Sequence, residues 1–143
     1  MTIAPGHFIE DLSVGQSASY TKTVTEADIV KFSEVSGDNN PVHLDEAFAQ
    51  STMFKGRIAH GMLSAGFIST VIGTKLPGSG TIYMSQTLRF RAPVRIGDTV
   101  TATCTITEII PEKRRAVLTT VCKVGDTVVI EGEALVMVPA RGK

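Results

Sequence analysis

The chain has 143 residues, 43% of them apolar, and its fourteen basic residues balance fourteen acidic ones. A chain of this length is expected to form one domain, residues 1–143, whose core needs no disulfide or metal. The zero net charge argues against nucleic acid or an anionic membrane surface as a partner. Cys104 and Cys122 lie in separate strand-like segments without metal-ligand spacing, so we expect reduced packing residues and no metal site.

The two ends and the longest uncharged segment bear on location. The N-terminus lacks the basic start and long apolar core of a signal peptide, and the final Arg-Gly-Lys is no peroxisomal address. Residues 58–74 are uncharged apart from a histidine, but they are too few and too polar to span a bilayer. We therefore expect a cytoplasmic protein without a membrane segment.

The first elements in chain order are a strand and a helix. Residues 17–24 are rich in β-branched and small polar residues, which favours a strand. Thr25 and Asp28 form a capping box, so a helix should begin there, and Gly37 is placed to end it. One face of this helix should be apolar and half buried, with Ile29, Phe32 and Val35.

The remaining pattern is a loop, a long helix and a set of strands. Asn40-Pro41 predicts a shaped loop over 38–43, and 45–50 adds one helical turn. Residues 61–74 carry no charge and are apolar or small all round, which is typical of a helix enclosed by protein. The rest should form an antiparallel meander curling around that helix, an α+β architecture, with strands at 81–91, 98–109, 115–124 and 127–138.

The strongest chemical feature is the pair Asp38 and His43. Neither a helix nor a strand brings residues five apart together, whereas a turn bent at Asn40-Pro41 does. A carboxylate and an imidazole at one water molecule would provide general acid and base catalysis. The alternative is a structural Asx-Pro turn with a surface histidine.

A longer motif surrounds this pair. Residues 32–49 read FSEVSGDNNPVHLDEAFA, which resembles, without departure, the signature of the R-specific enoyl-CoA hydratases, the MaoC-like group of hot-dog proteins. The likeness continues through 60–63 (HGML), 76–78 (LPG), 90–94 (FRAPV) and 97–98 (GD), and it covers residues 15–138. It implies a hot-dog fold and reversible hydration of a trans-2-enoyl thioester of coenzyme A or acyl-carrier protein, giving the (3R)-3-hydroxyacyl thioester. It also implies no cofactor, and a homodimer or higher homo-oligomer.

The resemblance also implies roles for single residues. Asp38 and His43 would hold the attacking water, Asn40 would orient it, and the Gly61 N–H would receive the thioester oxygen. A free N–H at a helix start is physically suited to a developing oxyanion. On the residues alone, Asn40 is equally well explained as a turn residue, and the alternative for Gly61 is a site that only allows tight packing.

Other polar residues near these motifs have two readings each. Ser69 lies on the Gly61 face of the 61–74 helix, so it is a candidate substrate-binding residue at the acyl tunnel, or else a buried serine bonded to its own helix. His60 is interpreted as a cap or packing residue. Five basic residues are candidates for coenzyme A phosphates or are solvated surface charges: Lys55, Arg57, Arg89, Arg91 and Arg95.

Two other functions remain open from the sequence. A hot-dog thioesterase, or a dehydratase that pairs a loop histidine with an acid on the central helix, needs a carboxylate that residues 61–74 do not contain. A non-catalytic acyl-thioester-binding or partner subunit has no use for a complete Asp, Asn and His set. The hydratase is therefore the preferred hypothesis, with acyl chain length and pathway left undetermined.

Overall fold

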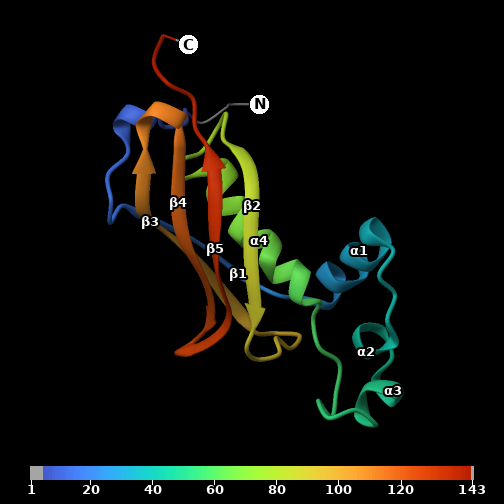
Figure 1. The fold of residues 1–143 in the computed structure, drawn as a ribbon. Coiled ribbons are helices and arrows are strands. Elements are labelled where there is room, and N and C mark those ends of the chain that lie inside the picture. Colours follow the sequence, from blue (N-terminus) through green and yellow to red (C-terminus); the bar gives the residue numbers. More distant parts are fainter. Residues whose placement is uncertain (1–4, 143) are drawn as a thin grey trace.

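The computed structural model describes residues 5–142, which form a curved five-stranded antiparallel sheet with one long helix on its concave side (Figure 1). This arrangement confirms the predicted α+β class. The strands are β1 (Ser17–Thr23), β2 (Ile82–Phe90), β3 (Thr99–Ile110), β4 (Arg115–Val124) and β5 (Thr127–Met137). The helices are α1 (Glu26–Ser36), α2 (Pro41–Leu44), α3 (Glu46–Gln50) and α4 (Gly61–Thr74), and short 3-10 turns span Ile9–Asp11 and Pro111–Lys113.

The strand order differs from the predicted meander. The order is β1-β3-β4-β5-β2, so only β3, β4 and β5 form a meander, and β2 lies at the far edge beside β5. The connection between β2 and β3 runs over 91–98 and contains Pro93. It is longer than the roughly two to five residues of a tight hairpin, so neighbours in sequence need not be neighbours in the sheet.

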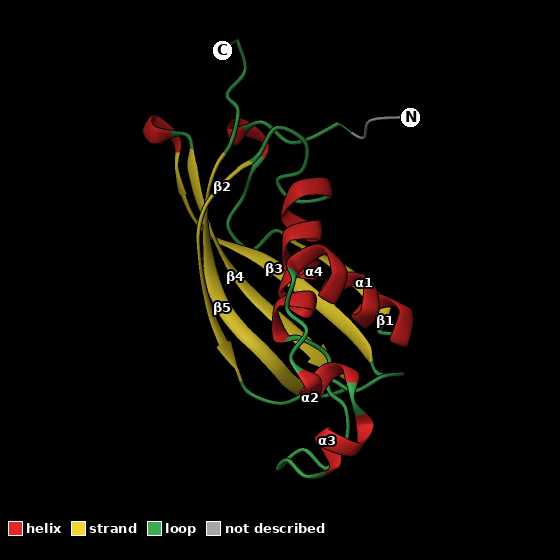
Figure 2. Ribbon diagram, turned by 90° about the vertical axis from the view of Figure 1, so that its right-hand side faces the viewer, coloured by secondary structure: helices red, strands yellow, loops and turns green. Residues whose placement is uncertain are grey.

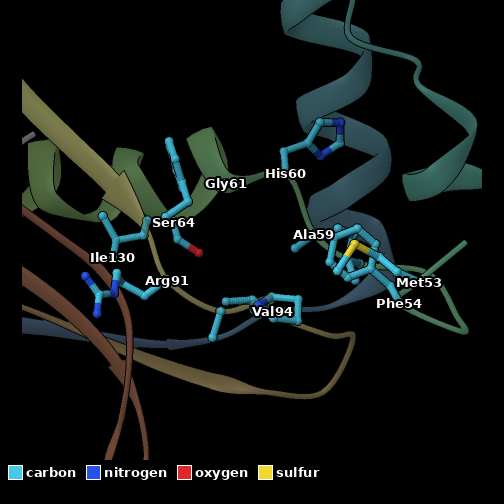
Figure 3. Close-up of a pocket in the computed structure, with 13 residues that line it drawn as sticks. Met53, Phe54, Ala59, His60, Gly61, Ser64, Arg91, Val94 and Ile130 are labelled. Atoms are coloured by element: carbon cyan, nitrogen blue, oxygen red, sulfur yellow. The ribbon is translucent and has the colours of Figure 1, made fainter.

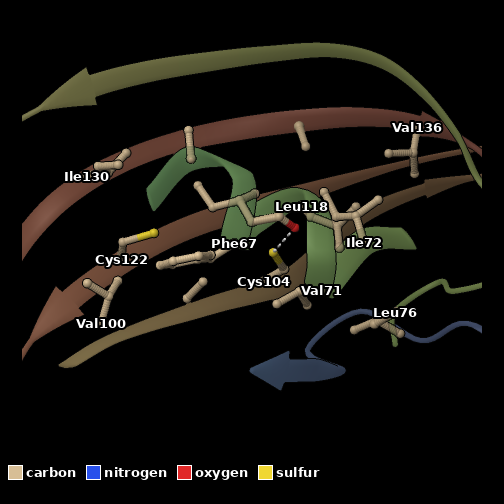
Figure 4. Packing of buried hydrophobic residues seen from close by; sticks show 14 of the residues in the cluster. Phe67, Val71, Ile72, Leu76, Val100, Cys104, Leu118, Cys122, Ile130 and Val136 are labelled. Atoms are coloured by element: carbon tan, nitrogen blue, oxygen red, sulfur yellow. Dashed lines mark hydrogen bonds between the residues drawn. The ribbon is translucent and has the colours of Figure 1, made fainter. Parts of the chain in front are cut away.

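The core lies between the concave face of the sheet and α4 (Figure 4). The helix contributes Phe67, Ile68, Val71 and Ile72, and the strands place small residues opposite it: Ala102, Cys104, Ala116, Cys122 and Ala134. Small side chains let the helix approach the sheet closely. Both cysteines are buried and unpaired, as predicted, and burial raises the pKa of each thiol to about 12.

The opposite face of α4 is not enclosed by any of residues 5–142. Met62 is 54% exposed, and Gly66, Ser69 and Gly73 are exposed on the same helix. The expectation of a helix covered on every side is therefore wrong for a single copy. The adjacent edge strand β2 also exposes large apolar side chains, among them Ile82, Met84 and Phe90.

Helix α1 begins and ends where the sequence predicts. The Thr25 hydroxyl accepts a hydrogen bond from the Asp28 N–H at 3.1 Å, the Thr25 N–H donates to Asp28 Oδ2 at 2.9 Å, and Gly37 closes the helix with a φ of 80°. The predicted apolar face is partly wrong, because Ser33 rather than Val35 is buried with Ile29. Figure 2 shows α1, α2 and α3 on the α4 side of the sheet. No helix of the described residues is long and apolar enough to cross a membrane.

Candidate active site

Asp38 and His43 are positioned by the turn that follows α1. The predicted loop is partly helical, because His43 lies on the single turn α2. Asn40 is its N-cap: the side-chain oxygen accepts a hydrogen bond from the Val42 N–H at 3.1 Å, and Pro41 occupies the first helical position. Asn-Pro is thus a helix start here, because both residue types are favoured at these two positions.

His43 is buried and held in one tautomer. Its Nδ1 lies 2.8 Å from the Ile58 carbonyl oxygen, which can only accept, so Nδ1 carries the proton. The remaining nitrogen, Nε2, therefore has a lone pair available as a base. Burial lowers the pKa of His43, and nearby His60 lowers it further, although the bond to Ile58 and the charge of Asp38 act in the opposite direction.

Asp38 lies close to this imidazole on the exposed side. One carboxylate oxygen accepts a hydrogen bond from the Asn40 N–H at 3.2 Å, forming an Asx turn that fixes the side chain. One ligand atom of Asp38 and one of His43 lie within 4.8 Å of each other. Two groups that each bond one water at hydrogen-bond distance are about 4.6 Å apart if the angle at the water is near tetrahedral. The spacing therefore suits a shared water molecule.

His60 also belongs to this cluster, although the sequence predicted no catalytic role for it. The residue is 2% exposed, and its ring contacts two others: it is stacked on His43 at 3.8 Å between centroids and tilted against Phe32 at 4.8 Å. The His60 Nε2 lies 3.0 Å from the Asp38 carbonyl oxygen and 3.1 Å from the Ser33 hydroxyl. His60 is the N-cap residue of α4 but makes no side-chain cap bond, so of the two predicted roles the packing role is the one confirmed. His60 ties the backbone of Asp38 and the ring of His43 to the start of α4.

The atoms of Asp38, His43 and His60 also have the proximity of a metal-ligand set. The two imidazoles, however, are stacked with an angle of 27° between their planes. Lone pairs lie in the ring plane, so those of stacked rings run nearly parallel and do not converge on one ion. This geometry fits a water molecule held by Asp38 and His43 better than a metal ion held by all three residues.

Gly61 opens α4 directly after His60. Its N–H belongs to the first turn, which has no intrahelical acceptor, and no acceptor is recorded for it among the described residues. A Cβ at this position would lie 2.5 Å from the Phe90 ring. The close packing predicted for this glycine is therefore confirmed, because its missing side chain makes room for a neighbouring aromatic ring, whereas the contact of its N–H with a thioester oxygen remains a prediction.

A pocket of about 320 Å³ begins at this helix start (Figure 3). Met53 and Phe54 stand on one side and Ser64 and Ile130 on the other, and the strand-to-loop segment from Phe90 to Val94 completes the wall. Asp38 and His43 do not line this pocket; His60 and Gly61 do, and the pair adjoins it through the His60 ring. Ser69 is exposed, so the interpretation as a buried serine bonded to its own helix is wrong. It does not line this pocket, and its role at an acyl tunnel remains a prediction.

Three of the basic residues considered for coenzyme A already make polar contacts within the fold, and one of them, Arg91, forms an ion pair with Glu131 at 3.1 Å. Arg57 donates from Nε to the His43 carbonyl oxygen at 2.7 Å and forms an ion pair with Glu26 at 2.7 Å. Arg95 donates to the Phe54 carbonyl oxygen at 2.6 Å. Arg57 and Arg95 thereby fix the position of the segment that contains the site.

Known proteins resemble this chain along most of its length. A family model described as MaoC like domain matches residues 12–131. The chain belongs to the MaoC-like family. The (R)-specific enoyl-CoA hydratase of Rhodospirillum rubrum is 62% identical over 95% of this chain and 94% of that protein. The 3-hydroxybutyryl-CoA dehydratase of Methylorubrum extorquens is 54% identical over 94% of this chain and 85% of that protein.

The MaoC-like domain also resembles solved structures along nearly its whole length. The unliganded R-hydratase PhaJ1 of Pseudomonas aeruginosa matches with a TM-score of 0.89 at 47% identity, covering 95% of this chain and 88% of that one. The predicted family and hot-dog fold are thus confirmed. The matched residues 12–131 include Asp38, His43, His60 and Gly61, so the whole candidate site lies within the MaoC-like domain.

Proposed function

We propose that this protein reversibly hydrates a trans-2-enoyl-CoA, or the corresponding carrier-protein thioester, to the (3R)-3-hydroxyacyl thioester. The observation that carries the proposal is the Asp38–His43 pair, whose spacing suits one water and whose imidazole has an unprotonated Nε2. The relatives at 62% and 54% identity bear the names of a hydratase and a dehydratase of this kind.

In the hydration direction, His43 Nε2 takes a proton from the water as its oxygen bonds to the β-carbon. The electron pair of the double bond moves toward the thioester oxygen, where the Gly61 N–H stabilises the negative charge. The α-carbon then takes a proton from the Asp38–His43 pair, so one hydroxyl and one proton are added in total. The reaction transfers no electrons to an external acceptor, and it therefore requires no redox cofactor.

The other enzymatic reading fits these residues less well. A hot-dog thioesterase or dehydratase that uses a carboxylate on the central helix needs an Asp or Glu in α4, and Gly61–Thr74 has neither. Asn40 uses its side-chain oxygen to cap α2, which leaves its amide nitrogen to orient water or substrate. That role for Asn40 remains a prediction.

The product's stereochemistry tests the proposal. With crotonyl-CoA the enoyl absorbance should disappear and chiral analysis should give the 3R alcohol. In heavy water, the hydroxyl and the new deuteron should be on the same face, because both come from the side on which Asp38 and His43 lie. The absence of hydration, or a 3S product, would contradict the function, whereas anti addition would contradict only the shared water.

We further infer that the active form is a homodimer or larger. Both β2 and the open face of α4 expose apolar side chains, and Phe90 of β2 lies against Gly61 at the start of α4. Among the described residues, β2 is an edge strand whose outer backbone groups have no partner strand. Sedimentation at micromolar concentration should show a dimer that Met84→Lys weakens and Val14→Lys, at an exposed position away from β2, does not. A fully active monomer would contradict the inference.

A further inference from the structure

Ser64 is a buried polar residue of the pocket that no step described so far uses. It lies on α4 one turn after Gly61 and has no exposed surface. Its hydroxyl has no hydrogen-bond partner among the described residues. Figure 3 shows the Ser64 oxygen directed into the space between α4 and the Arg91–Val94 segment.

This state is unusual for a helical hydroxyl. Serine and threonine within helices commonly bond the carbonyl four residues earlier. Two threonines of the same helix do so: Thr70 donates to the Gly66 carbonyl at 3.1 Å, and Thr74 donates to the Thr70 carbonyl at 2.6 Å. A buried hydroxyl without a partner is unfavourable in the free protein, so an acceptor that arrives with a ligand would explain it.

The position of Ser64 indicates which ligand atom this is. Side chains on a helix lean toward its N-terminus, so the Ser64 hydroxyl covers the first turn, where the unbonded Gly61 N–H lies. The two donors are three residues apart and therefore share one face of the helix. An oxygen placed before the helix start is within reach of both.

We propose that the Ser64 hydroxyl donates a second hydrogen bond to the thioester carbonyl oxygen, beside the Gly61 N–H. This inference rests on the proposed hydratase function. Negative charge grows on that oxygen as water attacks the β-carbon, so the bond strengthens toward the transition state and contributes to kcat more than to KM. Ser64 is then a catalytic residue that makes a direct substrate contact.

The first test compares two variants that each remove one hydroxyl from α4. Ser64→Ala should lower kcat for crotonyl-CoA by about 10²-fold, the usual effect of losing one oxyanion donor, with little change in KM. Thr74→Val, whose hydroxyl bonds only its own helix, should match the wild type. The melting temperature of Ser64→Ala should not fall, because its hydroxyl has no partner to lose. An unchanged kcat in Ser64→Ala would overturn the proposal.

The second test measures binding without turnover. Butyryl-CoA has the carbonyl oxygen but no double bond, and the thioether S-butyl-CoA lacks that oxygen. Ser64→Ala should weaken butyryl-CoA binding by about two- to tenfold and leave S-butyl-CoA binding unchanged. Equal effects on both ligands, or none, would overturn the role of Ser64. If Ser64→Ala weakens only butyryl-CoA binding but the wild type hydrates no enoyl thioester, the proposed function fails while the contact of Ser64 with the carbonyl oxygen stands.

Discussion

The α4–sheet core and the segment over residues 38–60 are held together by different interactions. In the core, aliphatic side chains such as Ile68, Val71 and Leu118 are fully buried. Between residues 38 and 60, the buried residues are only His43, Ala49, Gly56, Ala59 and His60. That segment is fixed mainly by hydrogen bonds to backbone carbonyls, from Arg57 to His43, from Arg95 to Phe54 and from His60 to Asp38.

The difference separates stability from chemistry. Burial of apolar surface supplies most of the free energy of folding, so the core should decide whether the chain folds. Directional bonds fix groups to within a fraction of an ångström, so the 38–60 segment should decide whether the folded chain reacts. Helix α4 joins the two, because its body packs in the core and its first turn lies in the site.

The largest expected effect is on turnover. Asp38→Asn and His43→Gln should each reduce kcat by about 10² to 10⁴, the range for removing a general acid or base. Neither change should alter the free energy of unfolding by more than a small amount, because neither residue contributes to the apolar core. Steady-state kinetics and denaturant unfolding of the same preparations measure both quantities.

The double variant tests whether Asp38 and His43 act on one water molecule. Two groups that hold one water act as a unit, so Asp38→Asn combined with His43→Gln should cost far less than the sum of the two separate losses. Additive losses would show that the residues act independently and would contradict a shared water.

The reverse behaviour is expected in the core. Leu118→Ala removes a fully buried side chain opposite α4 and should lower the free energy of unfolding by about 2 to 5 kcal/mol. Val117→Ala, on the other face of β4, should cost much less, because Val117 is only partly buried. Below its melting transition, Leu118→Ala should keep the wild-type kcat. A large loss of kcat in the folded variant would break the separation between core and site.

Much of the fold could be predicted because its signals are local. The capping box at Thr25, the stop at Gly37 and the uncharged stretch 61–74 each determine structure within a few residues, and all three elements occur as predicted. The position of β2 could not be predicted in this way. It depends on which edge of the sheet the 91–98 connection reaches, which is a property of the assembled core.

The same distinction between local and long-range contacts applies to the residues of the site. Asp38 and His43 come together within a single turn, so a sequence motif can identify them. His60 contacts Ser33 and Asp38 across the fold, and Ser64 lines the pocket. Their immediate neighbours in sequence give no sign of either placement. The available signal was their proximity to Gly61, because a histidine before and a serine one turn after the proposed oxyanion donor both lie at the start of α4, beside the pocket.

A smaller effect is expected from His60. His60→Phe keeps a ring against His43 but removes the donor to the Asp38 carbonyl oxygen, so the turn that carries Asp38 loses an anchor. We expect kcat to fall by about tenfold, the equivalent of one hydrogen bond, with KM unchanged. Ser33→Ala leaves the bond to Asp38 in place and should have less effect. Equal rates for His60→Phe and wild type would show that stacking alone positions the pair.

The smallest expected effect is a displacement of the pH profile. Burial lowers the pKa of His43 below its ordinary value of 6.5, so the imidazole stays unprotonated, and able to act as a base, at pH values where a free histidine is already charged. The acidic limb of kcat/KM should therefore lie below pH 6.5 and should be lost in His43→Gln.

The same shift should appear in stability, with a defined sign. The unfolded chain binds a proton at His43 near pH 6.5, and the folded chain binds it only at lower pH, so folding is progressively weakened as the pH falls from 6.5 to the folded pKa. Below the folded pKa, this contribution no longer changes. His43→Gln should remove that part of the pH dependence from unfolding curves measured on either side of pH 6.5. An acidic limb of the wild-type kcat/KM profile above pH 6.5 would mean that a charged partner, rather than burial, determines the pKa of His43. The site would then contain more water than its packing indicates.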